Sequence, residues 1–350
     1  MIHVLRNWVV RYFSDPEAVL LMVLLIGSIM LFAWMGAILA PVIASIIIAY
    51  LLQWLVNRLV LWRIPKLPAV LIVYIAFLGV FLCAMFILWP IIWQQLLKLV
   101  DELPNMISKT RQFLYLLPDR FPEYITKETV DVTVATSSME MKRFASQLLT
   151  MSIASIPSFI ALIVYFILVP IMVFFFLKDA KLISDYMSNF LPEKHKVLHT
   201  VWQDVDIQIG NYVRGKVAEV FIVGIASYIA FYLFHLQYAI LLAVLVGASV
   251  LVPYVGAAVV TVPVVLVAFF QWGYNAPEFF YLVMTYGIIQ TIDGTVLVPL
   301  LFSEAVNLHP VAIIVAILVF GGFWGFWGVF FAIPLATLVK AVIVAWPKSA

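Results

Sequence analysis

The chain has 350 residues, of which 65% are hydrophobic and 11% are charged, and its formal net charge is +2. Soluble domains carry roughly 25% charged residues, so this composition excludes an ordinary soluble fold and indicates a polytopic membrane protein in contact with membrane lipid. No basic run is long enough to suggest a nucleic-acid partner. The single cysteine, Cys83, excludes an intramolecular disulfide.

The first region, residues 1–93, is predicted to hold a surface helix and three membrane spans. Residues 2–13 form a short amphipathic segment with two arginines. The apolar runs 18–36, 37–57 and 68–90 are each long enough to cross a hydrocarbon core of about 30 Å. Because only Gly36 separates the first two runs, they are predicted to form a tight helical hairpin.

The middle of the chain alternates between polar and apolar segments. Residues 94–152 mix charged and apolar side chains at three- and four-residue spacing, which predicts amphipathic helices outside the bilayer. A fourth span is predicted at 153–177, then a cytoplasmic amphipathic segment at 178–213, then a fifth span from about Val217. Lysine and arginine gather at the two termini and in two connections of this chain, which predicts cytoplasmic N- and C-termini.

Residues 214–350 are predicted to be a transport region. The apolar runs 239–270 and 309–345 are too long for one simple span, and prolines and glycines interrupt both. Broken backbone at membrane depth must be buried in protein or line a cavity, so each run predicts a re-entrant hairpin. With the span 279–302 between them, they would form two inverted units, as secondary transporters do around a central binding site. The expected fold is all-α, with about eight membrane segments and amphipathic helices outside the bilayer.

The hairpin tips are candidate solute contacts. Glycine permits close backbone approach, and the start of a half-helix offers unpaired N–H groups to a ligand. The alternative is plain helix packing through small residues. The tip residues are Pro253, Tyr254 and Gly256 in the first hairpin and Gly321, Gly322, Gly325 and Gly328 in the second.

Asp293 is the main candidate for a substrate-pathway residue. It lies eleven residues before Glu304, which places it about 16 Å along a helix and near mid-bilayer. An ionised carboxylate there costs at least about 2.5 kcal/mol, so it is expected to bind solute, a cation or a proton. Gln290 and Thr291, within one helical turn, would extend the polar pathway. The alternative is a structural ion pair, for which Arg214 is the leading candidate partner and Lys216 another.

Four segments carry a resemblance to a known family: "YVRGK", "VLVGASVLVPYVGAAVVTVP", "DGTVLVPLLFSEAVNLHPVAI" and "FGGFWGFWGVFFAIPLATLVKAV". They resemble the autoinducer-2 exporter (AI-2E) family, and the whole chain, including "RYFSDPEA", is similar to its PerM-type permease branch. The resemblance implies a bacterial inner-membrane transporter of small solutes, with relatives that export autoinducer-2 and others described as sodium/proton antiporters. It also implies a homo-oligomer, with a pentamer as one candidate, and an elevator-like moving part built from the last third.

Three functions are therefore weighed: a transporter of a small polar solute, a sodium/proton antiporter and a non-transporting membrane scaffold. The paired broken helices favour a transporter over a scaffold, which has no need of them. A cation site usually recruits several oxygen ligands, and Asp293 is predicted to be the single deep acid of the final third, which favours a small polar solute. No enzyme motif, metal-ligand cluster or cofactor-binding pattern is present, so no enzyme activity, metal or cofactor is expected.

Overall fold

The computed structural model describes residues 16–115, 130–132, 134–136, 139, 143, 146, 156–188, 196–253, 255–302 and 308–345. Every regular element in these ranges is a helix, which confirms the all-α prediction. Six helices are long and apolar enough to cross a membrane: Ile38–Leu61, Lys66–Thr110, Asp206–Leu233, Val255–Trp272, Pro277–Phe302 and Pro310–Phe330. Shorter apolar helices accompany them at Val164–Lys178, Ala239–Ser249 and Ala332–Ala341. The chain is thus a polytopic membrane protein.

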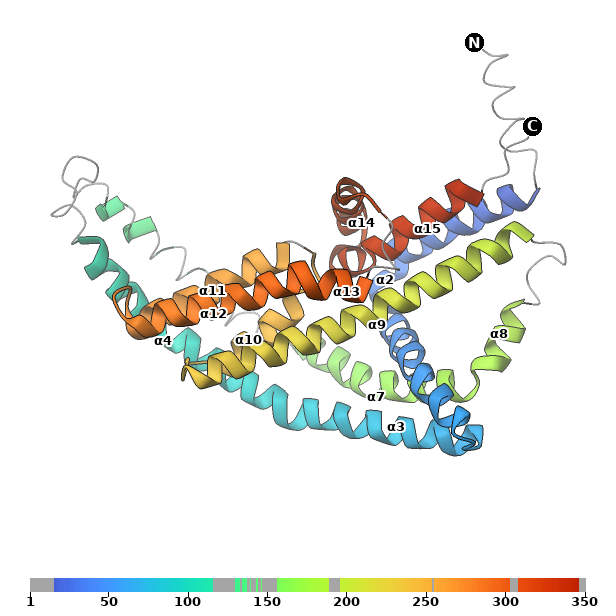
Figure 1. The fold of residues 1–350 in the computed structure, drawn as a ribbon, viewed down its shortest axis with the longest axis horizontal. Helices are drawn as coiled ribbons and strands as arrows, with labels where there is room; N and C mark the ends of the chain where they lie inside the picture. Colours follow the sequence, from blue (N-terminus) through green and yellow to red (C-terminus); the bar gives the residue numbers. More distant parts are fainter. Residues whose placement is uncertain are drawn as a thin grey trace, which may run out of the picture.

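The N-terminal part of the fold differs from the predicted pair of short spans. Helix α2 runs from Pro16 to Leu61 without interruption, so the predicted hairpin at Gly36 is wrong. A single glycine costs a helix only about 1 kcal/mol, and no turn residue accompanies Gly36. The helix also contains Pro41, whose carbonyl accepts a bond of 2.6 Å from Ser45 Oγ. Figure 1 shows that α2 bends along its length.

Helices α2, α3 and α7 pack around a core of their own. Helix α3 (Lys66–Cys83) continues through the π-helical turn η1 (Ala84–Leu88) into α4 (Trp89–Tyr115), so the third predicted span and the start of the amphipathic region form one rod. Helix α7 (Ile156–Lys178) is followed by the short amphipathic α8 (Ala180–Ser188). Val56 of α2, Val70 of α3 and Val173 of α7 are buried together. This core is the apolar seam that joins the first spans.

Helix α9 (Lys196–Leu233) is the central element of the second half. It passes without a break through the predicted boundary between the cytoplasmic segment and the fifth span. Figure 1 shows α9 running beside α12 (Pro277–Ile292) and α13 (Val298–Phe302), which are joined by the π-helical turn η2 (Asp293–Leu297). Phe231 of α9, Leu242 of α10 and Leu282 of α12 belong to one buried cluster.

Two helical hairpins flank α9, as the broken apolar runs predict. Hairpin 1 consists of α10 (Ala239–Ser249), a turn at 250–254 and α11 (Val255–Trp272). Hairpin 2 consists of α14 (Pro310–Phe330) and α15 (Ala332–Ala345), and its chain reverses inside α14 at Gly325, where φ is 57° and ψ is −131°. Such a positive φ is readily available only to glycine.

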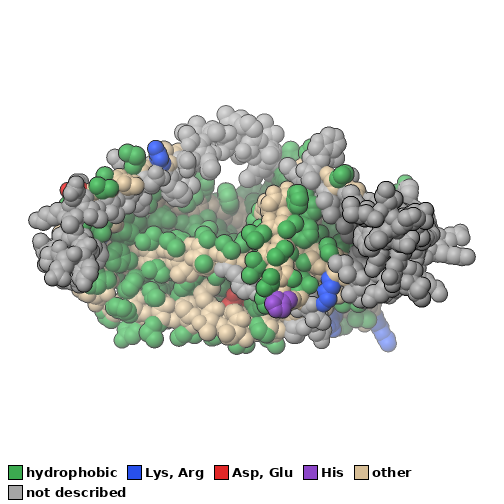
Figure 2. All heavy atoms as spheres, turned by 90° about the horizontal axis from the view of Figure 1, so that it is seen from above, with side chains coloured by type: hydrophobic (Ala, Val, Ile, Leu, Met, Phe, Trp, Pro, Cys, Tyr) green, Lys and Arg blue, Asp and Glu red, His purple; other side chains and the backbone are tan. Residues whose placement is uncertain are grey.

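The outer surface is apolar, as a lipid-facing protein requires. Large hydrophobic side chains are widely exposed on several helices; Leu61 and Leu300 are each 75% exposed. Figure 2 shows hydrophobic side chains spread over the described part of one face, with few charged groups among them. Because water would penalise this surface, its natural surroundings are lipid chains or other apolar protein surfaces.

Candidate functional site

Asp293 is buried at a local irregularity in a membrane helix. It is 9% exposed and begins the π-helical turn η2 directly after α12. The dipeptide Asp293–Gly294 therefore widens the helix instead of ending it. Two threonine hydroxyls bond to backbone carbonyls next to this turn: Thr291 Oγ1 donates to Gly287 O at 2.8 Å and Thr295 Oγ1 donates to Thr291 O at 2.6 Å, a pattern that often bends helices. Single π-helical turns occur frequently at functional sites.

The register between α9 and the α12–η2–α13 rod follows from two contacts. The rings of Phe231 and Tyr286 lie 6.1 Å apart, and a Cβ on Gly215 would lie 2.7 Å from Phe302 Cε1. Sixteen residues separate these contacts on each side, so the two rods run antiparallel at nearly equal rise. In this register, Ser227 on α9 is level with Gln290, one turn before Asp293.

Three buried polar atoms along this seam have no hydrogen-bond partner among the described residues: Ser227 Oγ, Gln290 Nε2 and Asp293 Oδ1. Leaving such an atom unsatisfied costs roughly 1–3 kcal/mol. Native proteins rarely accept that cost without a bound water, ion or ligand. At this level α9 and the α12–η2 rod carry one hydroxyl, one donor and one acceptor that have no partner among the described residues. We call these three residues the seam triad.

A buried charge cluster lies on α9 two to three helical turns before Ser227. Lys216 Nζ lies 2.7 Å from Glu219 Oε2 and donates to Val250 O at 2.8 Å. The same ammonium lies 5.1 Å from the centre of the Phe302 ring, which provides a cation–π contact. Lys216 and Glu219 are 4% and 2% exposed. Lys216 and Glu219 thus form a buried ion pair that also holds the turn of hairpin 1.

The structure adds a second buried acid to the final third, because Glu219 is buried as well as Asp293. A sequence signal for it exists: Glu219 falls two residues inside the predicted fifth span, and an acid within a span is itself a functional candidate. Because Lys216 lies three residues earlier on the same helix face, the sequence pattern of Glu219 looks like that of an ordinary ion pair at a helix end.

The predicted ion pair between Arg214 and Asp293 stays a prediction. In the structure Arg214 Nη2 donates to Asn211 Oδ1 at 2.8 Å, one turn back on its own helix. The cation in the electrostatic field of Asp293 is Lys216. Thr291, by contrast, is exposed and its hydroxyl is bonded within α12, so it does not join the buried group.

Both hairpin tips contain a glycine that permits close packing. A Cβ on Gly256 would overlap the carbonyl oxygen of Ser249, and a Cβ on Gly328 would overlap that of Phe320. Both hairpins are thus closed by a glycine that lies directly against a backbone carbonyl. Gly321 packs against Val329, whereas Gly322 and Gly325 face open space. Among the other predicted tip residues, Pro253 lies in the turn of hairpin 1 and Tyr254 lies outside the described residues.

Helix α9 holds both hairpins through side chains one turn apart. Lys216 Nζ donates to Val250 O in hairpin 1, and Tyr212 Oη donates to Phe330 O in hairpin 2 at 3.1 Å. Tyr212 is 1% exposed. Both hairpins are therefore bonded to one helix, and hairpin 1 is bonded to the lysine of the charge cluster.

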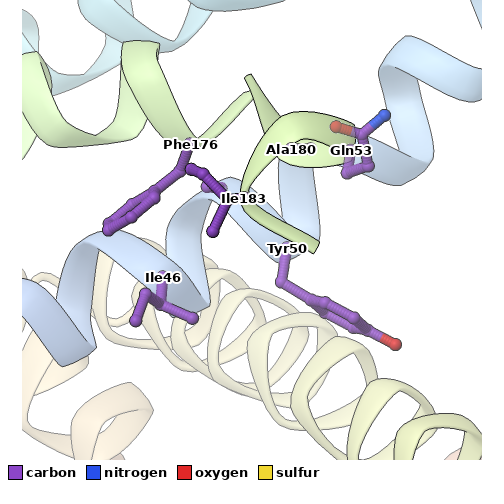
Figure 3. Close-up of a pocket in the computed structure, with 7 residues that line it drawn as sticks. Ile46, Tyr50, Gln53, Phe176, Ala180 and Ile183 are labelled. Atoms are coloured by element: carbon purple, nitrogen blue, oxygen red, sulfur yellow. The ribbon is translucent and has the colours of Figure 1, made fainter. Parts of the chain in front are cut away.

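A cavity of about 260 Å³ lies elsewhere, in the angle between α2, α7 and α8. It is lined by Ile46, Tyr50 and Gln53 of α2, Phe176 of α7 and Ile183 of α8, and Figure 3 shows the Tyr50 ring directed away from Phe176 and Ile183. Its lining is largely apolar and holds none of the predicted site residues. The cavity is therefore separate from the seam triad.

Comparisons with known proteins agree with the transporter features. The family model described as "AI-2E family transporter" matches residues 20–348. The chain is 45% identical over 347 residues to "Putative permease PerM" of Escherichia coli K12, a match that covers 99% of this chain and 98% of that protein. It is 26% identical to "Putative transport protein YrrI" of Bacillus subtilis, covering 87% of this chain and 85% of that protein. Matched almost from end to end by a family model and by a permease, the chain belongs to the AI-2E transporter family.

Proposed function

We propose that this AI-2E family member is a secondary transporter that moves a small polar solute across the bacterial inner membrane. The observation that carries the proposal is the seam triad: Ser227 Oγ, Gln290 Nε2 and Asp293 Oδ1 are buried polar atoms without a partner in the described part of the chain. A solute with hydroxyl or amide groups would supply the missing bonds. Its binding would offset the desolvation cost of these three buried atoms.

The proposed movement is elevator-like, with the last third as the moving part. Two features support it. Helices α2, α3 and α7 have a core of their own, while α9 joins both hairpins through Lys216 and Tyr212. The two parts also meet, because Tyr50 of α2 donates to Asp206 O of α9 at 3.1 Å. In this proposal the hairpins are re-entrant and both termini are cytoplasmic, as the distribution of lysine and arginine predicts.

Cation antiport is the competing outcome of the test. The sequence argument against a cation assumed one deep carboxylate, and Glu219 is a second buried one. The cluster nevertheless brings its own cation, Lys216, into contact with Glu219. The carboxylate of Glu219 is therefore already paired with an ammonium and is less available to a metal cation. This favours a neutral polar solute over a metal cation.

The proposal is tested by a flux panel on the purified protein in liposomes. The panel offers autoinducer-2 and small polyols, and separately a sodium or a proton gradient without solute. Wild type should move at least one polyol-like solute, and Asp293→Asn should lose or uncouple that flux while the protein still folds. Glu278→Gln, an exposed acid at the start of α12, is the matched control and should transport normally. Solute flux unchanged in Asp293→Asn, or sodium–proton exchange alone, would contradict the proposal.

A further inference from the structure

Helices α2 and α7 run parallel beside the cavity between α2, α7 and α8. Ser45 Oγ of α2 lies 3.4 Å from Val169 O of α7. Further along both helices, Gln53 of α2 and Phe176 of α7 line the same cavity. The C-terminal ends of α2 and α7 and the start of α8 therefore lie at the same membrane surface. The distribution of lysine and arginine predicts that this surface is cytoplasmic.

The lining of the cavity changes from apolar to polar toward that surface. Ile46 of α2 and Phe176 of α7 belong to its apolar part, and Gln53 follows about two helical turns after Ile46. In the parallel register Gln53 is level with the last residues of α7. Its Nε2 atom donates to Asn57 Oδ1 at 2.9 Å, whereas its Oε1 atom is buried without a partner among the described residues. An apolar compartment thus leads to one unpaired hydrogen-bond acceptor.

Three exposed cations lie at the same end of the cavity: Arg58 on α2, Lys178 at the end of α7 and Lys181 on α8. Lys181 directly follows Ala180, which lines the cavity. Arg58 lies 5.3 Å from the centre of the Trp54 ring. None of the three cations forms an ion pair with a described carboxylate. Unpaired cations beside an apolar cavity suit the phosphate group of a lipid.

The acids at this surface do not cancel its cations. Residues 54–70 carry three cations and no acid, and residues 156–188 carry two lysines with Asp179 and Asp185. A third acid, Asp206 of α9, lies next to the hydroxyl of Tyr50. Three cations and two lysines therefore stand against three described acids. A surface that is positive overall attracts anionic lipid headgroups.

We propose that this cavity binds one anionic phospholipid with hydroxyl groups in its headgroup, phosphatidylglycerol being the simplest. One acyl chain enters the apolar part, a headgroup hydroxyl donates to Gln53 Oε1, and the phosphate lies between Lys178 and Lys181 with Arg58 beside it. The cavity volume of about 260 Å³ supports this assignment. Pockets for whole small molecules measure roughly 300–1,000 Å³, so the cavity fits part of a lipid better than a complete soluble ligand.

The site is tested by photo-labelling of the purified full-length protein in detergent, without solute. The probe is phosphatidylglycerol with a diazirine near the end of one acyl chain. The label should appear in peptides that cover 43–53 and 172–184, which line the cavity. Unlabelled phosphatidylglycerol should compete about tenfold more strongly than phosphatidylethanolamine, because the latter has no net charge for the cations to attract.

Two matched pairs of charge changes separate a site from general attraction to a positive surface. Lys178→Gln combined with Lys181→Gln should weaken labelling about tenfold or more, because both phosphate contacts are lost. Arg63→Gln combined with Lys66→Gln removes the same charge from the exposed connection between α2 and α3, which does not line the cavity. This second pair should weaken labelling by about twofold at most, since salt screens distant charges.

Ala180→Phe tests the apolar part of the site. The added ring should fill the cavity and remove the label from both peptides, whereas Ala76→Phe on the exposed face of α3 should not. Thermal unfolding in matched detergent shows whether each variant folds. If Ala180→Phe does not fold, the two charge pairs decide alone: a larger loss with the lysine pair supports the site, and an equal loss refutes it.

The proposal is overturned if phosphatidylethanolamine competes as well as phosphatidylglycerol or if both charge pairs weaken labelling equally. Absence of the label from both peptides also overturns it, and would mean that detergent or a second copy of the chain fills the cavity. The transport proposal stands apart from these outcomes. A protein that binds the lipid but carries no solute lacks only the proposed transport, whereas one that carries solute without this labelling lacks only the lipid site.

Discussion

Single residues explain why broken helices persist in this fold. Gly256 and Gly328 remove the Cβ atoms that would overlap carbonyl oxygens across each hairpin tip. Glycine otherwise weakens a helix by about 1 kcal/mol relative to alanine, so its use here reflects a close approach of backbone to backbone. Backbone atoms cannot rotate aside as a flexible side chain can. The tips therefore depend on these two positions more than on their neighbours.

Gly256→Ala is predicted to destabilise the protein, whereas Gly287→Ala is not. The added methyl at position 256 meets the Ser249 carbonyl, and such overpacking costs about 1–3 kcal/mol. No atom lies within 4 Å of a Cβ at Gly287 on α12, so alanine there should gain helix propensity. Thermal unfolding in matched detergent compares the two. Equal melting temperatures would show that hairpin 1 does not close as tightly as described.

At the scale of helices, α9 is the element on which the site depends. Tyr212 bonds to hairpin 2 and Lys216 bonds to hairpin 1. The same helix also supplies Ser227 of the seam triad. The antiparallel rod α12–η2–α13 then sets Asp293 and Gln290 against it. A helix that bonds to both hairpins can pass a change at one tip to the other.

Tyr212→Phe should loosen hairpin 2 and leave hairpin 1 unchanged. The substitution keeps the ring contacts with Phe302 and Phe330 but removes the donor to Phe330 O. Leaving that carbonyl unsatisfied costs roughly 1–3 kcal/mol. Hydrogen exchange should rise in peptides that cover 321–335 and stay constant in those that cover 248–258. Tyr232→Phe, an exposed tyrosine on the same helix, is the control. Faster exchange in both hairpins would mean that α9 itself has been disturbed.

Sequence patterns predict the helical membrane class and both hairpins, because long apolar runs and proline–glycine interruptions are local signals. They fail where the outcome depends on partners distant in the chain. Nothing local shows that α2 passes through Gly36, since a turn and a tolerated glycine look alike. Nothing local separates Lys216 from Arg214 as the cation in the electrostatic field of Asp293. That choice depends on which face of α9 meets η2. Ser227 is missed for the same reason: an isolated serine in a span is usually bonded to its own helix.

At the scale of the whole molecule, the protein combines two packed parts with different characters. The part around α2, α3 and α7 has an apolar core and contains the π-helical turn η1, and the part around α9 contains buried charges, the π-helical turn η2 and two glycine-closed tips. Buried charges and irregular backbone are costly in a membrane. The part with the buried charges and both glycine-closed tips is therefore the part in which we propose the solute site.

The central claim is that the seam triad binds the transported solute, and saturation kinetics of Ser227→Ala test it most directly. Ser45→Ala is the control, because Ser45 is also fully buried but donates to Pro41 O within α2. With the solute that the flux panel identifies, Ser227→Ala should raise KM about fivefold to tenfold, the loss of one hydrogen bond of about 1 kcal/mol or slightly more, while Ser45→Ala leaves it unchanged. An unchanged KM in Ser227→Ala, or the same rise in both variants, would contradict the claim.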